Sequence, residues 1–240
     1  MLPIRDVNPT RIRPLVTWAV IAVNAFVFFY IQPQDAEEAT EFAYERAAIA
    51  CELTTGEPLS LEEITSDRCL DGAEAPFFRG KNVWFSGLVS MFLHGSIAHI
   101  LFNMWSLWIF GNNVEEAFGH LGYLLFYVAA GIAATVGFVA VNPDLTVPLI
   151  GASGAIAGVM GAYLVLFPKH LVLSLILFRV VAIPAVVFLG FWFFSQFLFE
   201  VEGVAWEAHV AGFVFGAIVA LPFREKLLTR TLAGENPVSV

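Results

Sequence analysis

Residues 151–158 read GASGAIAG and lie inside an apolar stretch that runs from residue 149 to residue 167. The stretch places a single hydroxyl, that of Ser153, among three glycines, at a depth where a membrane helix would meet lipid. A serine in such a helix is often packing material. Its role therefore depends on which other polar side chains the chain sends to the same depth.

The composition indicates an integral membrane protein. Hydrophobic residues make up 58% of the 240 residues, charged residues make up 14%, and the mean hydropathy is +0.76, which is outside the usual balance of soluble domains. A helix that crosses a hydrocarbon core of roughly 30 Å needs about 20 apolar residues. Six stretches predict an all-α bundle of six transmembrane helices within residues 15–222: 15–31, 88–110, 121–141, 149–167, 180–199 and 204–222.

Two apolar stretches have alternative interpretations. Residues 171–178 (LVLSLILF) are apolar but too short to span a bilayer, so we expect them to lie at a membrane interface. Residues 15–31 could be a cleaved signal sequence. No small-residue cleavage motif follows them, which favours a transmembrane helix.

Lysine and arginine predict the orientation in the membrane. They lie before the first predicted helix, between the fourth and fifth helices and after the sixth, whereas the short loops on the other side carry none. Short loops rich in lysine and arginine are cytoplasmic. We therefore expect both termini, residues 1–14 and 223–240, to be cytoplasmic.

Residues 32–87 then form a long extracytoplasmic loop. The loop holds 12 of the 21 acidic residues of the chain, so it could be an interaction surface or a gate; a solvated insertion is an equally good interpretation. Cys51 and Cys69 both fall in this loop. In an oxidising compartment a disulfide between them would stabilise the fold by about 3 kcal/mol if unstrained. Two free thiols or a weak metal pair are the alternatives.

The polar side chains within the predicted helices are concentrated in the second, fourth and sixth helices. Polar groups in hydrocarbon are costly enough to indicate function. These three helices run from the outer face inward, and at about 1.5 Å per residue Ser153 and His209 lie at one level. His99 and Asn103 are four residues apart, so they project from one helical face at a comparable depth.

Glycine spacing predicts that the fourth and sixth helices touch. Gly154 and Gly158 are four residues apart, as are Gly212 and Gly216. Small residues at this spacing let two helix backbones approach closely enough for side chains to meet. Each pair alone is weak evidence, and the presence of the serine and the histidine in the same two helices strengthens the prediction.

Four motifs together resemble those of the rhomboid family of intramembrane serine proteases. They are GxSGxxxG around Ser153, HxxxxHxxxN from His94 to Asn103, AHxxGxxxG from residue 208 to residue 216, and GxxxExxxG from residue 111 to residue 119. The match covers four of the six predicted helices in the order and spacing of the family. No single motif is specific, but the combination is.

The resemblance implies a catalytic dyad in which Ser153 is the nucleophile and His209 is the general base. Serine is a poor nucleophile unless a base lies within hydrogen-bond reach, and imidazole can take the proton and return it to the leaving amine. Glu207 lies two positions before His209, about 200° around the helix. A conventional triad with this carboxylate is therefore not expected.

The resemblance also implies an oxyanion hole formed by the Asn103 amide, the His99 ring and the backbone N–H of Ser153. Gly151 and Gly154 would free the backbone to place the hydroxyl and the N–H side by side at the start of a helix, where N–H groups lack partners. His94 would support the adjoining loop. Glu115, in a cytoplasmic loop, would buttress the second and third helices.

The chain departs from the family pattern in ways that affect the site. Ala157 stands where some family members have a tyrosine that stacks on the base, so we expect His209 to be oriented by packing or by another aromatic ring. The resemblance implies that substrates are transmembrane helices entering from the lipid bilayer and that the fifth helix is a movable gate. Its aromatic run FWFFSQFLF is equally well explained as ordinary packing against lipid.

Other classes of function are less well supported. A rhomboid-like pseudoprotease that only binds membrane proteins would be expected to lack Ser153 or His209, and both are present. A transporter would be expected to show a repeated pattern between its halves, and none is evident. The residues indicate no metal site, no cofactor and no nucleic-acid binding. The substrate and the oligomeric state are left open.

Overall fold

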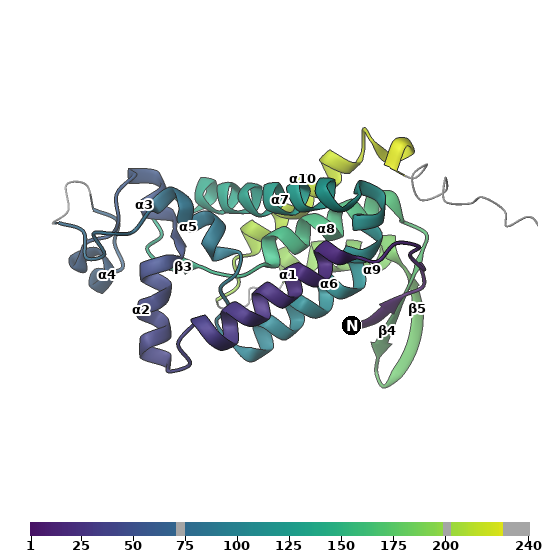
Figure 1. Cartoon of the computed structure of the whole chain (residues 1–240), viewed down its shortest axis with the longest axis horizontal. Helices are drawn as coiled ribbons and strands as arrows, with labels where there is room; N and C mark the ends of the chain where they lie inside the picture. Colours follow the sequence, from purple (N-terminus) through teal and green to yellow (C-terminus); the bar gives the residue numbers. More distant parts are fainter. Residues whose placement is uncertain (71–74, 199–202, 228–240) are drawn as a thin grey trace, which may run out of the picture.

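The computed structural model describes residues 1–70, 75–198 and 203–227, and these are mostly helical. Long helices form a bundle, the short helices within residues 32–87 lie at one end of it, and a small sheet lies at the other end (Figure 1). The mostly helical structure agrees with the expected all-α architecture. Two small β-sheets are an addition that the sequence did not indicate.

Each of the six predicted apolar stretches overlaps one of the longer helices. Their bounds are α1 Leu15–Phe26 with its π-helical continuation Val27–Ile31, α6 Ile97–Phe118, α7 His120–Val141, α8 Ser153–Leu166, α9 Ala185–Leu198 and α10 Trp206–Ala220. Among the described helices, α7 alone has both the length and the mean hydropathy to cross a bilayer. Helix α8 has 14 residues and is about 21 Å long at roughly 1.5 Å per residue. The count of six membrane spans therefore stays a prediction.

The predicted start of the second helix, at residue 88, is wrong. Residues up to Ser90 belong to a separate short helix, α5 Val83–Ser90, and α6 begins only at Ile97. The Ser96 hydroxyl accepts the His99 N–H at 3.1 Å and caps α6. Helix α6 then continues past residue 110 to Phe118, because apolarity by itself does not mark where helical hydrogen bonding starts or stops.

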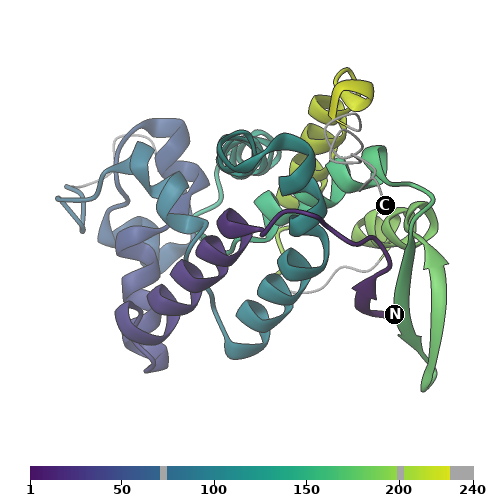
Figure 2. The ribbon, with the colours of Figure 1, turned by 45° about the vertical axis from the view of Figure 1, so that its right-hand side comes forward.

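The apolar segment that follows α8 forms a β-hairpin. Strands β4 Leu171–Ile176 and β5 Arg179–Pro184 pair antiparallel, and β1 Leu2–Asp6 adds to β4, giving the order β1-β4-β5. Figure 2 shows the N-terminal strand beside the hairpin. The fifth predicted helix was expected from residue 180, but its first residues are strand β5, and residue 199 lies outside the described residues.

The long loop before α5 is a folded unit with α2 Ala36–Arg46, β2 Ala48–Ile49, α3 Ala50–Thr55 and α4 Leu61–Ser66. A disulfide joins Cys51 to Cys69. Within the described ranges, the one cluster with metal-ligand spacing is Cys51, Glu63 and Cys69, and its two sulfurs are already bonded to each other. Strand β2 pairs with β3 Pro148–Leu149, shortly before α8. The loop is thus tied to the segment that leads to Ser153.

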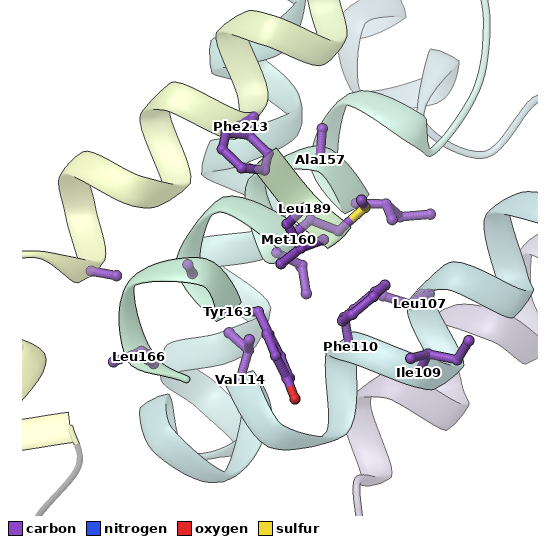
Figure 3. Close-up of a cluster of buried hydrophobic side chains, with 14 of the residues drawn as sticks. Leu107, Ile109, Phe110, Val114, Ala157, Met160, Tyr163, Leu166, Leu189 and Phe213 are labelled. Carbon is purple, nitrogen blue, oxygen red and sulfur yellow. The ribbon is translucent and has the colours of Figure 1, made fainter. Parts of the chain in front are cut away.

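Helix α8 lies at the centre of the bundle. It packs against α6, α7, α9 and α10, and Figure 3 shows Ala157, Met160 and Tyr163 of α8 among side chains of the neighbouring helices. A Cβ atom added at Gly212 would overlap the Gly154 carbonyl oxygen, and one at Gly216 would overlap the Gly158 carbonyl oxygen. Helices α8 and α10 are therefore in backbone contact at these glycines.

Replacing Gly216 with alanine should force α8 and α10 apart, because the new methyl group would occupy the position of the Gly158 carbonyl. We expect a loss of about 1–3 kcal/mol of stability, as for other overpacked cores, measured as a lower unfolding temperature in detergent. The control is Gly190→Ala in α9, where the added Cβ would meet no atom within 4 Å. Equal unfolding temperatures for the two variants would contradict the backbone contact.

Strand β1 is anchored to the helices through Asp6. Its carboxylate accepts hydrogen bonds from Asn113 Nδ2 of α6 at 2.7 Å and from the Tyr163 hydroxyl of α8 at 2.9 Å. Burial is the largest influence and raises the pKa of Asp6 from 3.8 to about 6, although the hydrogen bonds act in the opposite direction. The neutral carboxyl is therefore the form that the fold favours.

The raised pKa of Asp6 predicts a pH-dependent stability. Because the folded pKa lies above the unfolded one, the carboxyl contributes stability that is complete below about 3.8 and lost as the pH rises through about 6. Asp6→Asn keeps a neutral acceptor at all pH values. We expect thermal unfolding to show the wild type losing stability relative to the variant as the pH rises from about 4 to about 7, whereas a constant difference across this range would contradict the shift.

Candidate active site

Ser153 and His209 meet where α8 and α10 both begin, at one end of the contact between the two helices. Ser153 is the first residue of α8, and His209 lies in the first turn of α10. The Ser153 Oγ and His209 Nε2 atoms are 2.8 Å apart. The distance is that of a hydrogen bond, and the tautomer of the imidazole decides which of the two groups donates. The close approach of the two backbones at the glycines allows these short side chains to touch.

His99 and Asn103 of α6 face the same cavity, which has a volume of about 980 Å³ and is also lined by Gly151, Gly154 and Ser153. Asn103 is only 7% exposed, and its Nδ2 has no hydrogen-bond partner within the described part of the chain. A buried N–H donor of this kind is free to bind a group that enters the cavity.

The tautomer of His99 follows from its surroundings. Its Nδ1 accepts the Gly95 N–H at 3.4 Å, so a neutral ring carries its proton on Nε2. A Cβ added at Gly151 would lie 2.8 Å from that Nε2 and 3.4 Å from Ser153 Oγ. The His99 N–H and the Ser153 hydroxyl thus flank the same glycine, on the cavity side of the site.

Gly151 is required by its backbone as well as by its neighbours. Its φ angle of 125° lies in a region that side-chain-bearing residues rarely adopt, and its N–H donates to the Ser90 carbonyl at 2.9 Å. The turn stops α8 from extending toward residue 149, where the sequence predicted it to begin. Ser153 is thereby left in the first turn, where backbone N–H groups have no intrahelical partner.

His94 lies next to this group and is absent from the residues that line the cavity. It is buried, and its ring centroid is 5.0 Å from that of His99 and 6.5 Å from that of Phe28. The Gln32 side chain accepts the His94 N–H at 2.9 Å and donates to its carbonyl at 3.1 Å. These contacts fit a residue that holds the turn before α6 in place.

Two residues at the site were missed by the sequence analysis, and both are on α9. Gln196 Oε1 lies 2.8 Å from His209 Nδ1, and the ring centroid of Trp192 lies 5.9 Å from that of His209. Trp192 is thus the aromatic neighbour of the imidazole in a chain that has Ala157 at the expected tyrosine position. The available signal was a lone amide one helical turn from a tryptophan in the run FWFFSQFLF.

Within the described residues, neither glutamate discussed at the sequence level is hydrogen-bonded to Ser153 or His209, although Glu207 lines the same cavity. Glu207 accepts a hydrogen bond from Asn142 Nδ2 at 2.9 Å. Glu115 accepts the backbone N–H groups of Val16 and Thr17 at 2.9 and 2.8 Å, and it pairs with His120 Nδ1 at 2.6 Å. It therefore connects the starts of α1 and α7 to α6.

The fold and the site define a class of protein: an apolar, mainly helical chain with a hydrogen-bonded serine–histidine pair in a cavity between its helices. The family model for the rhomboid domain matches residues 81–226, more than half of the chain. The chain therefore belongs to the rhomboid family, and like other members it is an integral membrane protein.

Several curated proteins are similar to this chain. The rhomboid protease GluP of Bacillus subtilis is 32% identical over 67% of this chain and 32% of its own length. Mitochondrial rhomboid protein 1 of Saccharomyces cerevisiae is 30% identical over 53% of this chain and 32% of its own length. Mitochondrial RHOMBOID-like protein 6 of Arabidopsis thaliana is 35% identical over 32% of this chain and 24% of its own length. The chain thus spans at most about a third of each of these relatives.

Proposed function

We propose that this protein is an intramembrane serine endopeptidase that hydrolyses peptide bonds in or near the transmembrane helices of membrane-protein substrates. The observation that carries the proposal is the 2.8 Å contact between Ser153 Oγ and His209 Nε2. The pair faces a cavity that can hold a peptide segment, beside the Asn103 Nδ2 donor, which has no hydrogen-bond partner within the described residues. Membership of the family that includes GluP supports the same reaction.

In the proposed reaction His209 acts first as a base and then as an acid. As Ser153 Oγ attacks the scissile carbonyl, its proton passes to His209 Nε2. The imidazolium returns that proton to the leaving amine, and an acyl-enzyme remains. Water then attacks the ester, His209 removes the proton of that water, and Ser153 is released as a free hydroxyl with the carboxylic acid product.

The tetrahedral intermediates need hydrogen-bond donors at their oxyanion. The proposed donors are Asn103 Nδ2, His99 Nε2–H and the backbone N–H of Ser153. The unpartnered amide of Asn103 and the inferred tautomer of His99 support the first two, and the position of Ser153 at the start of α8 supports the third. Donors that are fixed before the reaction need no reorganisation as charge develops.

The proposed topology has six spans, both termini in the cytoplasm and the cavity opening toward the extracytoplasmic side. The distribution of lysine and arginine supports this orientation, as does the position of the outer-loop helices at the cavity end of the bundle (Figure 1). A substrate helix would enter sideways past α9 and unwind at the cut, because helical peptide bonds are occupied by their own hydrogen bonds. Most of the C-terminal tail, residues 228–240, lies outside the described residues.

A rhomboid-like binding protein without protease activity is the competing function. The chain retains the serine and the histidine at hydrogen-bond distance, which favours the enzyme. Reconstitution with a reporter transmembrane helix in liposomes tests the choice. We expect cleavage by the wild type and none by Ser153→Ala or His209→Ala, together with labelling of the wild-type serine by a fluorophosphonate. Cleavage that persists in Ser153→Ala would exclude the proposed mechanism.

Asn103→Ala should slow the chemical step without weakening substrate binding. The loss of one oxyanion donor typically lowers kcat by about 10²–10³-fold, and we expect KM to change little. The matched control is Asn112→Ala on the same helix, since the Asn112 side chain contacts Asn113 and does not line the cavity. An unchanged kcat in Asn103→Ala would remove this residue from the oxyanion hole.

A further inference from the structure

Helix α9 places one amide side chain against the base of the serine–histidine pair. Gln196 Oε1 lies 2.8 Å from His209 Nδ1, the ring nitrogen opposite the one that contacts Ser153. His209 is thus held at both nitrogens by groups from two different helices. Within the described residues, His209 Nδ1 has no other hydrogen-bond partner, so Gln196 is the group in place to orient this end of the ring.

Further contacts fix the orientation of the Gln196 amide. Its Nε2 donates to the Trp192 carbonyl at 3.2 Å and lies 3.5 Å from Ser195 Oγ. A carbonyl oxygen can only accept a hydrogen bond, so the NH₂ group of Gln196 must be on that side. The amide oxygen therefore faces His209.

An amide oxygen beside Nδ1 selects one tautomer of the imidazole. Because the oxygen can only accept, Nδ1 must carry the proton of the neutral ring. The lone pair is then on Nε2, where it can accept the Ser153 hydroxyl proton. The other tautomer would place an N–H on Nε2 and could not act as the base.

We propose that Gln196 is a positioning residue that extends the dyad to a Ser153–His209–Gln196 relay. This inference rests on the proposed protease function. In many serine hydrolases a buried carboxylate fixes the tautomer and the orientation of the catalytic histidine ring, and here the Gln196 amide has that role. As a neutral group it avoids the cost of placing an isolated charge at membrane depth.

The relay depends on how α9 is seated against α10. Trp192 and Gln196 are one helical turn apart and approach His209 together, while Trp192 and Phe193 contact Phe213 of α10 with ring centroids 5.8 and 4.9 Å apart. Moving α9 away would break the bond to Nδ1. His209 therefore has the reactive tautomer fixed only when α9 is packed against α10 as it is here. The position of α9 is thus linked to the chemical step.

The test compares Gln196→Leu with Gln196→Glu in the full-length protein. Leucine removes the acceptor, and we expect kcat and fluorophosphonate labelling to fall by about 10- to 100-fold with little change in KM, as for the loss of one buried hydrogen bond at the reacting base. Glutamate keeps an acceptor oxygen at the same position and should restore both values. A loss of kcat and labelling that glutamate does not restore would indicate packing alone and overturn the proposal.

The tautomer can be read without measuring activity. With ¹⁵N-labelled histidine, the wild type should show a protonated Nδ1 on His209, and Gln196→Leu should shift toward a mixture of tautomers. The control Gln34→Leu makes the same substitution at a side chain that donates to the Phe28 carbonyl outside the site, and it should leave both spectrum and kcat unchanged.

The two proposals fail in different ways. If the wild type neither cleaves the reporter helix nor reacts with the fluorophosphonate, the protease function is excluded. The NMR spectrum of His209 then still tests whether Gln196 fixes its tautomer. If the wild type is active and Gln196→Leu has the same kcat and the same spectrum, the protease function stands and the relay is overturned.

Discussion

The site depends on the backbone contact between α8 and α10. At Gly212 and Gly216 any side chain would overlap a carbonyl oxygen of α8, so the two helices approach as closely as their main chains permit. This approach brings the first turns of both helices together, so that Ser153 and His209 meet at 2.8 Å. Lipid supplies no hydrophobic force between helices, which makes this steric fit the main means of holding the pair together.

The remaining elements hold the two ends of the site. On one side, Ser90 accepts the Gly151 N–H through its carbonyl and the Ala48 N–H through its hydroxyl, so the turn before Ser153 is joined to the long loop that contains the disulfide. On the other side, α9 brings an amide and an aromatic ring to His209. The acidic loop is thus part of the support of the site, in addition to any role as a solvated surface.

Much of the site could be predicted because its residues lie in local motifs. The spacing of His99 and Asn103 on α6, and the glycines around Ser153 and after His209, are visible in a single pass along the chain. Gln196 and Trp192 were missed because their partner is on another helix and the aromatic run fits lipid packing equally well. The start of α6 was predicted too early because the apolar stretch begins at residue 88. The Ser96 side chain caps the helix, and this cap decides that the helix begins at Ile97.

Apolar composition in the sequence was sufficient to predict the membrane environment and the approximate positions of the apolar helices, and local motifs carried the family resemblance that implied the residues of the candidate site, because each of these features depends on residues near one another in the chain. The pairing of β1 with β4, the disulfide, and the seating of α9 against His209 were decided only by the tertiary structure. They depend on distances between segments far apart in sequence, and those distances are set by how the helices pack rather than by any one stretch of residues.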